Sequence, residues 1–174
     1  MAEKIKNVLW CSAPQVEAEL SRLDAKWKPV EIPYGEIDWR TSATNKARFL
    51  GTVDSDVEKI VLAWLAGKTL PWIIVIKTAT GYWVIDGLHR LTAFKVMVDR
   101  PLLTVLRNLR IPVYLVDTTD RKLIFEIQSS INQLNGHPLS PQEALAKAVI
   151  LVKEHGRSQK EAAAAMSIHL STLN

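Results

Sequence analysis

Hydrophobic and polar residues follow different periods along this chain, and the changes of period divide it into three parts. From Pro14 to Trp27 apolar residues recur at helical spacing with charged residues between them, which is typical of an amphipathic helix. Residues 29–117 alternate between short apolar runs and helical patterns, which predicts a mixed sheet with helices. Residues 118–174 carry helical patterns only. We therefore predict an α+β chain with a helical extension (1–28), a small mixed-sheet domain (29–117) and an all-α segment (118–174).

The middle part contains the elements of a small sheet. The run from Trp72 to Ile76 is apolar throughout, as expected of a central strand that is buried on both faces. A turn at residues 78–81 joins it to the next apolar run, so the two strands are predicted to form a hairpin. The predicted strands are residues 29–33, 72–76, 82–85 and 111–116, and the predicted helices are residues 55–67 and 87–99.

Capping residues mark the starts of the helices that are predicted in the last part. Ser140 stands before Pro141, and Glu143 follows three residues after the serine, which predicts a capping box. Ser158 and Glu161 repeat the same spacing further along the chain. The predicted helices of this part are residues 120–131, 140 to about 155, and a third from 158 onward.

Composition and charge limit the class of protein. A chain of 174 residues with 48% hydrophobic and 23% charged residues is an ordinary globular chain of one domain, or one domain and an appendage. It lacks the long apolar run of a membrane span and the pattern of a signal peptide, so we expect a cytoplasmic protein with no membrane partner. The lone Cys11 excludes an internal disulfide. The net charge of +4 permits a polyanionic partner without requiring one.

The most informative stretch follows the second strand of the predicted hairpin. Asp86 and Gly87 form a tight turn, and a helix begins with His89 and Arg90 in its first turn. Backbone N–H groups at such a helix start favour an anion, and two cationic side chains there oppose the helix dipole unless an anion is bound. The other interpretation, equally open from spacing alone, is that Asp86 simply pairs with Arg90 or His89 and caps the helix.

These residues resemble the nucleotide-binding motif of the ParB/sulfiredoxin-like superfamily. Gly87, Arg90 and Ala93 match its G-x-x-R-x-x-A pattern. Downstream, Asn132 to Ser140 (NQLNGHPLS) is similar to a segment of ParB-like transcriptional regulators of the StrR type. The resemblance covers about residues 29–174 and implies a ParB/sulfiredoxin-like fold.

The resemblance also implies a nucleotide and a metal ion, because ParB-type relatives bind CTP with Mg²⁺. It places Asn132 at the metal. The glutamate that the family often has next to this asparagine, or two residues before it, is replaced by Ile131 and Ser130, which argues against metal binding and triphosphate hydrolysis. The implied nucleotide-binding residues are Arg40, Thr41, Arg48, Asp86, Gly87, Leu88, His89, Arg90 and Ala93.

The end of the chain looks like the opening of a helix-turn-helix. The first helix would span residues 159–165, the turn 166–168, and a recognition helix would start near Leu170. The sequence enters that helix by about one turn, so we expect a truncated or incomplete module, or a plain helical hairpin. The expected DNA-binding residues are Ser158, Gln159, His169, Ser171, Thr172 and Asn174.

Two classes of function follow from these patterns. The first is a ParB-like DNA-binding protein, a transcription regulator or partition factor, that forms a homodimer and uses CTP as a switch. The second is a small-molecule kinase or nucleotide hydrolase of the same fold, with Glu36 or Asp86 as the catalytic base. Sulfiredoxin activity is excluded because Leu88 replaces the motif cysteine, and a two-metal nuclease lacks clustered carboxylates. A family member that binds only protein is a third possibility.

Overall fold

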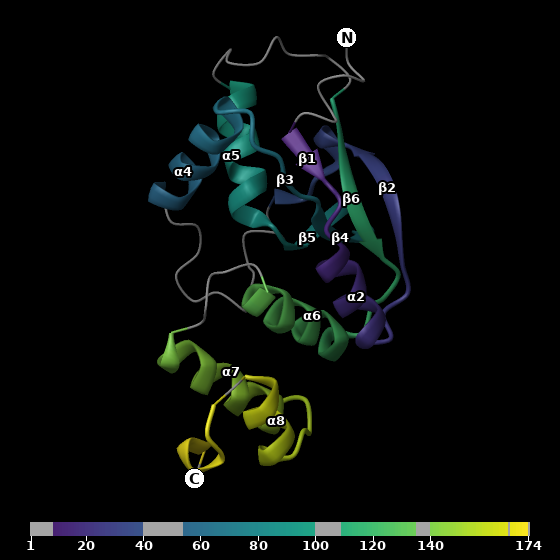
Figure 1. The fold of residues 1–174 in the computed structure, drawn as a ribbon. Helices are drawn as coiled ribbons and strands as arrows, with labels where there is room; N and C mark the ends of the chain where they lie inside the picture. Colours follow the sequence, from purple (N-terminus) through teal and green to yellow (C-terminus); the bar gives the residue numbers. More distant parts are fainter. Residues whose placement is uncertain (1–8, 40–53, 100–108, 135–139, 167, 174) are drawn as a thin grey trace.

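A four-stranded mixed sheet forms the centre of the molecule (Figure 1). The computed structural model describes residues 9–39, 54–99, 109–134, 140–166 and 168–173. The strand order is β2–β6–β4–β5, with β6 parallel to β4 and antiparallel pairs at both edges. A short parallel pair, β1 with β3, lies outside this sheet. The strands are β1 (Trp10–Cys11), β2 (Trp27–Pro33), β3 (Leu70–Pro71), β4 (Ile73–Thr78), β5 (Gly81–Asp86) and β6 (Arg110–Val116).

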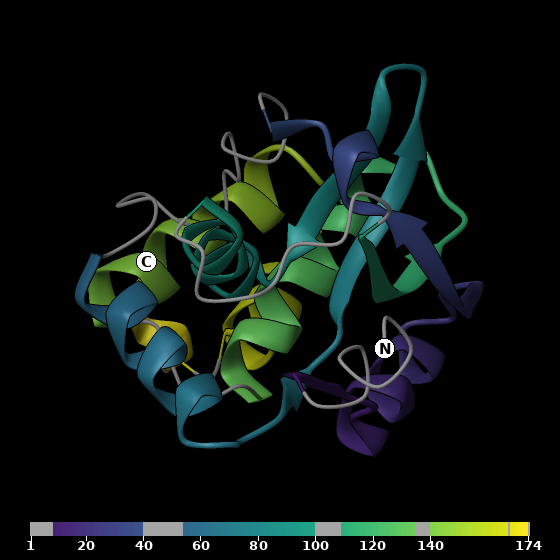
Figure 2. The same ribbon diagram turned by 90° about the horizontal axis from the view of Figure 1, so that it is seen from above.

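Helices cover both faces of the sheet, which explains the apolar run in β4. Ile73 and Val75 pack toward one face, where α4 (Asp54–Leu65) and α5 (Leu88–Asp99) lie. Ile74 and Ile76 pack toward the other, against α2 (Pro14–Arg22) and α6 (Arg121–Leu134). Figure 2 shows α4 and α5 on the side of the sheet away from α2. The mixed sheet, the hairpin and the α+β class predicted from the sequence are confirmed.

The helical segment forms a third layer of helices, beyond the pair α4 and α5 and the pair α2 and α6, and it lies on the outer side of α6 (Figure 1). It contains α7 (Pro141–Lys153), α8 (Gln159–Ala165) and a short 3-10 turn, η2 (Leu170–Leu173). Both predicted capping boxes are present, at Ser140 with Glu143 and at Ser158 with Glu161. Phe125 of α6 packs among small residues of α7 and α8 and joins this layer to the rest. No helix in the described ranges is long and apolar enough to cross a membrane.

The predicted helix from Pro14 to Trp27 is wrong in its second half. The helix ends at Arg22, the chain turns at Asp24 with φ of 57°, and Trp27 begins β2 opposite Val116. Trp27 keeps its apolar contact from a strand, because its ring packs edge-on against Tyr114. The sequence pattern predicted one continuous helix because a tryptophan at this spacing fits a helix as well as a strand, so the pattern does not reveal the turn.

The spacing of apolar residues in the helix predicted over residues 55–67 places Val57, Trp64 and Leu65 on one apolar face. Val57 and Trp64 are buried as predicted, whereas Leu65 is 55% exposed. The two-residue strands β1 and β3 were not predicted at all, because two residues are too few to show a period.

Tyr114 connects α2 to the sheet through its hydroxyl group. The backbone N–H of Ala13 donates to this hydroxyl at 2.7 Å, and the hydroxyl donates to Glu17 Oε1 at 3.0 Å. The tyrosine is fully buried, and burial raises the pKa of its phenol to about 12. Since Ala13 has no capping side chain of its own, the phenol satisfies a backbone donor at the start of α2.

We expect Tyr114→Phe to lower the free energy of unfolding by about 1–3 kcal/mol, because it leaves the buried Ala13 N–H without an acceptor. Urea unfolding at neutral pH measures the change. Tyr82→Phe is the control, because the Tyr82 hydroxyl makes no hydrogen bond among the described residues. Equal stability of the two variants would contradict the role of the hydroxyl.

Candidate functional site

The turn between β5 and α5 can accept only glycine at residue 87. Gly87 has φ of +96°, and a Cβ built on it would lie 2.5 Å from Cγ2 of Ile73. The chain therefore turns directly over the central strand, and α5 begins at the next residue. The N-terminal end of this 12-residue helix carries backbone N–H groups and the positive end of its dipole. This is the geometry that favours an anionic ligand.

Arg90 lies at this turn and is held by the protein itself. Its Nη2 donates to Asp86 Oδ2 at 2.6 Å, and the two side chains are only 11% and 9% exposed. Its Nη1 donates to the carbonyl oxygen of Trp72 at 3.1 Å and also to that of Pro71. The guanidinium thus joins the end of β5, the first turn of α5 and the β3–β4 connection. The pairing of Asp86 with Arg90, one of the two interpretations left open, is present in the structure.

The other residues predicted at the nucleotide lie in different environments. His89 and Leu88 are half-buried in the first turn of α5, next to Gly87. Ala93 is fully buried in the core between the sheet, α4 and α5. Arg40, Thr41 and Arg48 lie outside the described residues. The structure therefore brings Asp86, Leu88 and His89 together around Gly87, with Arg90 closing the inner side.

The two candidate catalytic carboxylates lie at opposite ends of β5. The carbonyl of Glu36 approaches Gly81 at the start of the strand, whereas Asp86 ends it. At about 3.4 Å per residue these points are about 17 Å apart along the strand. Glu36 is half-exposed and pairs with Lys77 at 3.5 Å. The structure does not bring these two carboxylates into one site.

Asn132, the predicted metal-binding residue, is 4% exposed on α6. Mg²⁺ prefers carboxylate oxygens and usually keeps several waters, so it needs an open site. Within the described part of the chain, no group of three or more His, Cys, Asp or Glu side chains is placed to hold a metal ion.

The residues predicted to contact DNA gather on α8 and η2, with Asn174 outside the described residues. Gln159, His169, Ser171 and Thr172 are all exposed. His169 Nδ1 and Ser171 Oγ are 2.8 Å apart, so these two side chains form one polar group. Ser158 uses its hydroxyl in the capping box, where it accepts from the Glu161 N–H at 3.2 Å. Ala162 and Ala163 face inward, which turns the polar side of α8 to the outside.

Comparisons with known proteins concern the fold. No protein-family model matches the sequence, and no curated protein matches it. The structure is similar to the C-terminally truncated chromosome-partitioning protein ParB from Caulobacter crescentus complexed to the centromeric parS site. The TM-score is 0.55 at 18% identity, over 83% of this chain and 67% of that one. The same protein complexed with CTP-gamma-S gives a TM-score of 0.43 at 20% identity, over 84% of this chain and 74% of that one. The similarity to the parS complex shows that this chain has a ParB-like fold.

We expect Gly87→Ala to destabilise the protein by about 2–4 kcal/mol, because the left-handed backbone conformation and the contact with Ile73 both oppose a Cβ. Gly67→Ala is the matched control: Gly67 has φ of +80° but no atom within 4 Å of its Cβ position. Its cost should be about 1 kcal/mol, from the backbone alone. Urea unfolding of both variants gives the comparison, and equal costs would contradict a steric role for Ile73.

We expect Arg90→Ala to destabilise the protein by about 3–5 kcal/mol, because Asp86 is left buried without its cation. The double variant Asp86→Ala with Arg90→Ala should be more stable than the sum of the two single effects predicts, by about 1–3 kcal/mol. A double-mutant cycle from unfolding free energies measures this coupling. Strict additivity would show that the pair does not contribute as a unit.

Proposed function

We propose that this chain is a ParB-like DNA-binding protein, of the transcription-regulator or partition type, whose sheet domain binds a nucleotide as a conformational switch. The observation that carries the proposal is the ParB-like fold. The likeness to a protein bound to the parS site extends over 83% of this chain.

The DNA-binding surface in this proposal is the outer side of α8 and η2. The exposed Gln159, His169 and Thr172 offer hydrogen-bonding groups for base edges or phosphates. The capping box of Ser158 and Glu161 orients the start of α8, and the buried alanines of this helix hold it against α7. The proposed DNA-binding surface therefore includes a helix, α8, that is capped at its start and packed against α7.

The nucleotide in this proposal binds at the β5–α5 turn, with CTP as the first candidate because of the sequence resemblance to the ParB/sulfiredoxin-like motif. The N-terminal end of α5 would receive phosphate, and Gly87 would permit the close approach. Because Arg90 is bound by Asp86 and two carbonyl groups, it acts by keeping the turn in place. In this proposal the half-buried His89 of the same first turn contacts the phosphate.

The switch works in this proposal through a homodimer. A nucleotide that binds one arrangement of two protomers more tightly than another shifts their equilibrium by its differential affinity. A rearrangement of the sheet domain would also move the DNA-binding helices, because α6 contacts both the sheet and the third layer. Nucleotide binding would thereby change DNA affinity.

The test is DNA selection followed by affinity measurement with and without nucleotide. We expect the chain to enrich specific duplexes from a random pool. We expect CTP with Mg²⁺ to change the affinity for the enriched duplex at least about threefold, a free-energy coupling of the usual allosteric size. ATP and GTP should have no such effect. Fluorescence anisotropy at fixed salt concentration measures both, since DNA affinity depends strongly on salt.

The variant His89→Ala should keep DNA binding and lose the response to CTP. His155→Ala is the control, because His155 is half-buried beyond the end of α7 and stacks on Phe125, away from the β5–α5 turn. Failure to enrich any duplex would contradict the DNA-binding function. A CTP response that persists in His89→Ala would contradict the nucleotide site.

A further inference from the structure

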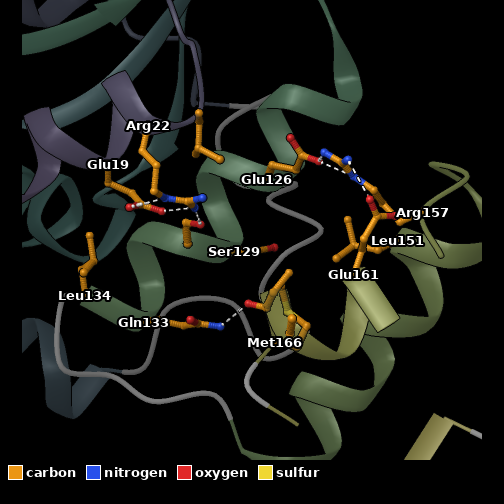
Figure 3. Close-up of a pocket in the computed structure, with 14 residues that line it drawn as sticks. Glu19, Arg22, Glu126, Ser129, Gln133, Leu134, Leu151, Arg157, Glu161 and Met166 are labelled. Carbon is orange, nitrogen blue, oxygen red and sulfur yellow. Dashed lines mark hydrogen bonds and ion pairs between the residues drawn. The ribbon is translucent and has the colours of Figure 1, made fainter. Parts of the chain in front are cut away.

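A hollow of about 590 Å³ lies between α2, α6 and α8, apart from the β5–α5 turn (Figure 3). Its volume is within the range of small-molecule sites, which is roughly 300–1,000 Å³. We call it the junction hollow, because one side belongs to the sheet domain and the other to the third layer. The residues that carry the argument are Ser129 and Leu134 on α6, Leu151 on α7, and Glu161, Ala164 and Met166 on or next to α8.

Polar contacts between distant segments hold the walls of the junction hollow. Arg157 Nε donates to Glu126 Oε1 at 2.9 Å, which joins the start of α8 to α6. Gln133 Nε2 donates to the carbonyl oxygen of Ala165 at 2.9 Å and joins the other end of α8 to α6. On the α2 side, Arg22 is bound through two of its nitrogens to both carboxylate oxygens of Glu19. The hollow is therefore a built feature of the fold.

Ser129 lines the hollow from α6 with a hydroxyl group that has no partner. The residue is only 1% exposed, and its Oγ makes no hydrogen bond within the described part of the chain. In Figure 3 its side chain projects from α6 toward α8. A buried hydroxyl without a partner costs free energy, which a ligand that supplies a donor or acceptor would recover. Leu134, Leu151 and Met166 give the same hollow an apolar side.

The charges of the lining leave one carboxylate incompletely matched. Three glutamates and two arginines line the hollow, and Glu19 is fully engaged by Arg22. Arg157 is shared: it is hydrogen-bonded to Glu126, but its Nη1 stays 4.0 Å from Glu161 Oε1. Hydrogen bonds from Ser158 hold the pKa of Glu161 below its usual value, so it is ionised at neutral pH. The positive charge of Lys122 also lowers the pKa of Glu161, but Lys122 does not line the hollow.

We propose that the junction hollow binds a small organic amine that carries one positive charge and an apolar body. The ammonium group would lie at Glu161 Oε1, where it completes the charge balance of the wall. The apolar body would lie along Leu134, Leu151 and Met166, and Ser129 would accept or donate one hydrogen bond. An anion would meet an excess of carboxylates, and an uncharged ligand would lack a charge-assisted hydrogen bond to Glu161.

A ligand in this position touches α6, which packs on the sheet, and α7 and α8 of the third layer. It would therefore favour one placement of the third layer relative to the sheet, by as much as its affinity differs between placements. An effect on DNA affinity rests on the proposed function, whereas binding of the amine does not.

The test is calorimetric titration of the full chain, without DNA or nucleotide, with three ligands of similar shape and different charge. The probes are 2-phenylethylamine, 2-phenylethanol and phenylacetate. We expect 2-phenylethylamine to bind at least about tenfold more tightly than either of the others. No binding of the amine, or equal binding of all three probes, would overturn the proposal. Neither result bears on DNA or CTP binding, so failure here is distinguishable from failure of the proposed function.

Variants then locate the binding site. Ala164 is exposed and lines the hollow, so Ala164→Phe should fill it and weaken amine binding at least about tenfold. Ala18→Phe on the exposed side of α2, outside the lining, should leave binding unchanged. Glu161→Gln should also weaken binding, and it keeps an acceptor for the capping box at Ser158. Full binding by Ala164→Phe would show that the amine binds elsewhere and would overturn the assignment.

Discussion

The buried pair of Arg90 and Asp86 is the interaction on which the rest of the site depends. The guanidinium reaches the carboxylate at the end of β5 and the carbonyl oxygens that precede β4, so one side chain joins three segments. Those contacts hold the turn at Gly87, and α5 begins at the next residue. Two cationic residues at a helix start would otherwise oppose the helix dipole. The pair with Asp86 removes this cost for Arg90.

α6 has the second organising role because it is buried on two sides. One side, with Ile127 and Ile131, completes the core beneath the sheet. The other meets the third layer through one large apolar residue, Phe125, and through polar groups such as Ser129 and Gln133. A contact surface of this composition gains less from apolar burial than a core does. It is held by specific ion pairs and hydrogen bonds, and it encloses the junction hollow.

Both proposed ligands would therefore act on the same property, the placement of the third layer relative to the sheet domain. In the proposed function a nucleotide acts on that placement from the β5–α5 turn. In the further inference an amine acts on it from the junction hollow. The two ligands carry opposite charge and occupy different sites, so each can act without the other.

Features that depend on neighbouring residues could be predicted from the amino-acid sequence. The hairpin of β4 and β5, the helix after Gly87 and both capping boxes were predictable, because they rest on contacts a few residues apart. The resemblance of the turn motif extended this to the ParB-like fold. Tertiary structure decided what depends on distant partners. Arg90 is bound by the carbonyls of Pro71 and Trp72, which carry no mark in a sequence. Trp27 is a strand residue because β6 pairs with it, and the burial of Ser129 on α6 depends on the packing of distant elements. An apolar or small polar residue fits several local structures, and only the packing of remote elements selects among them.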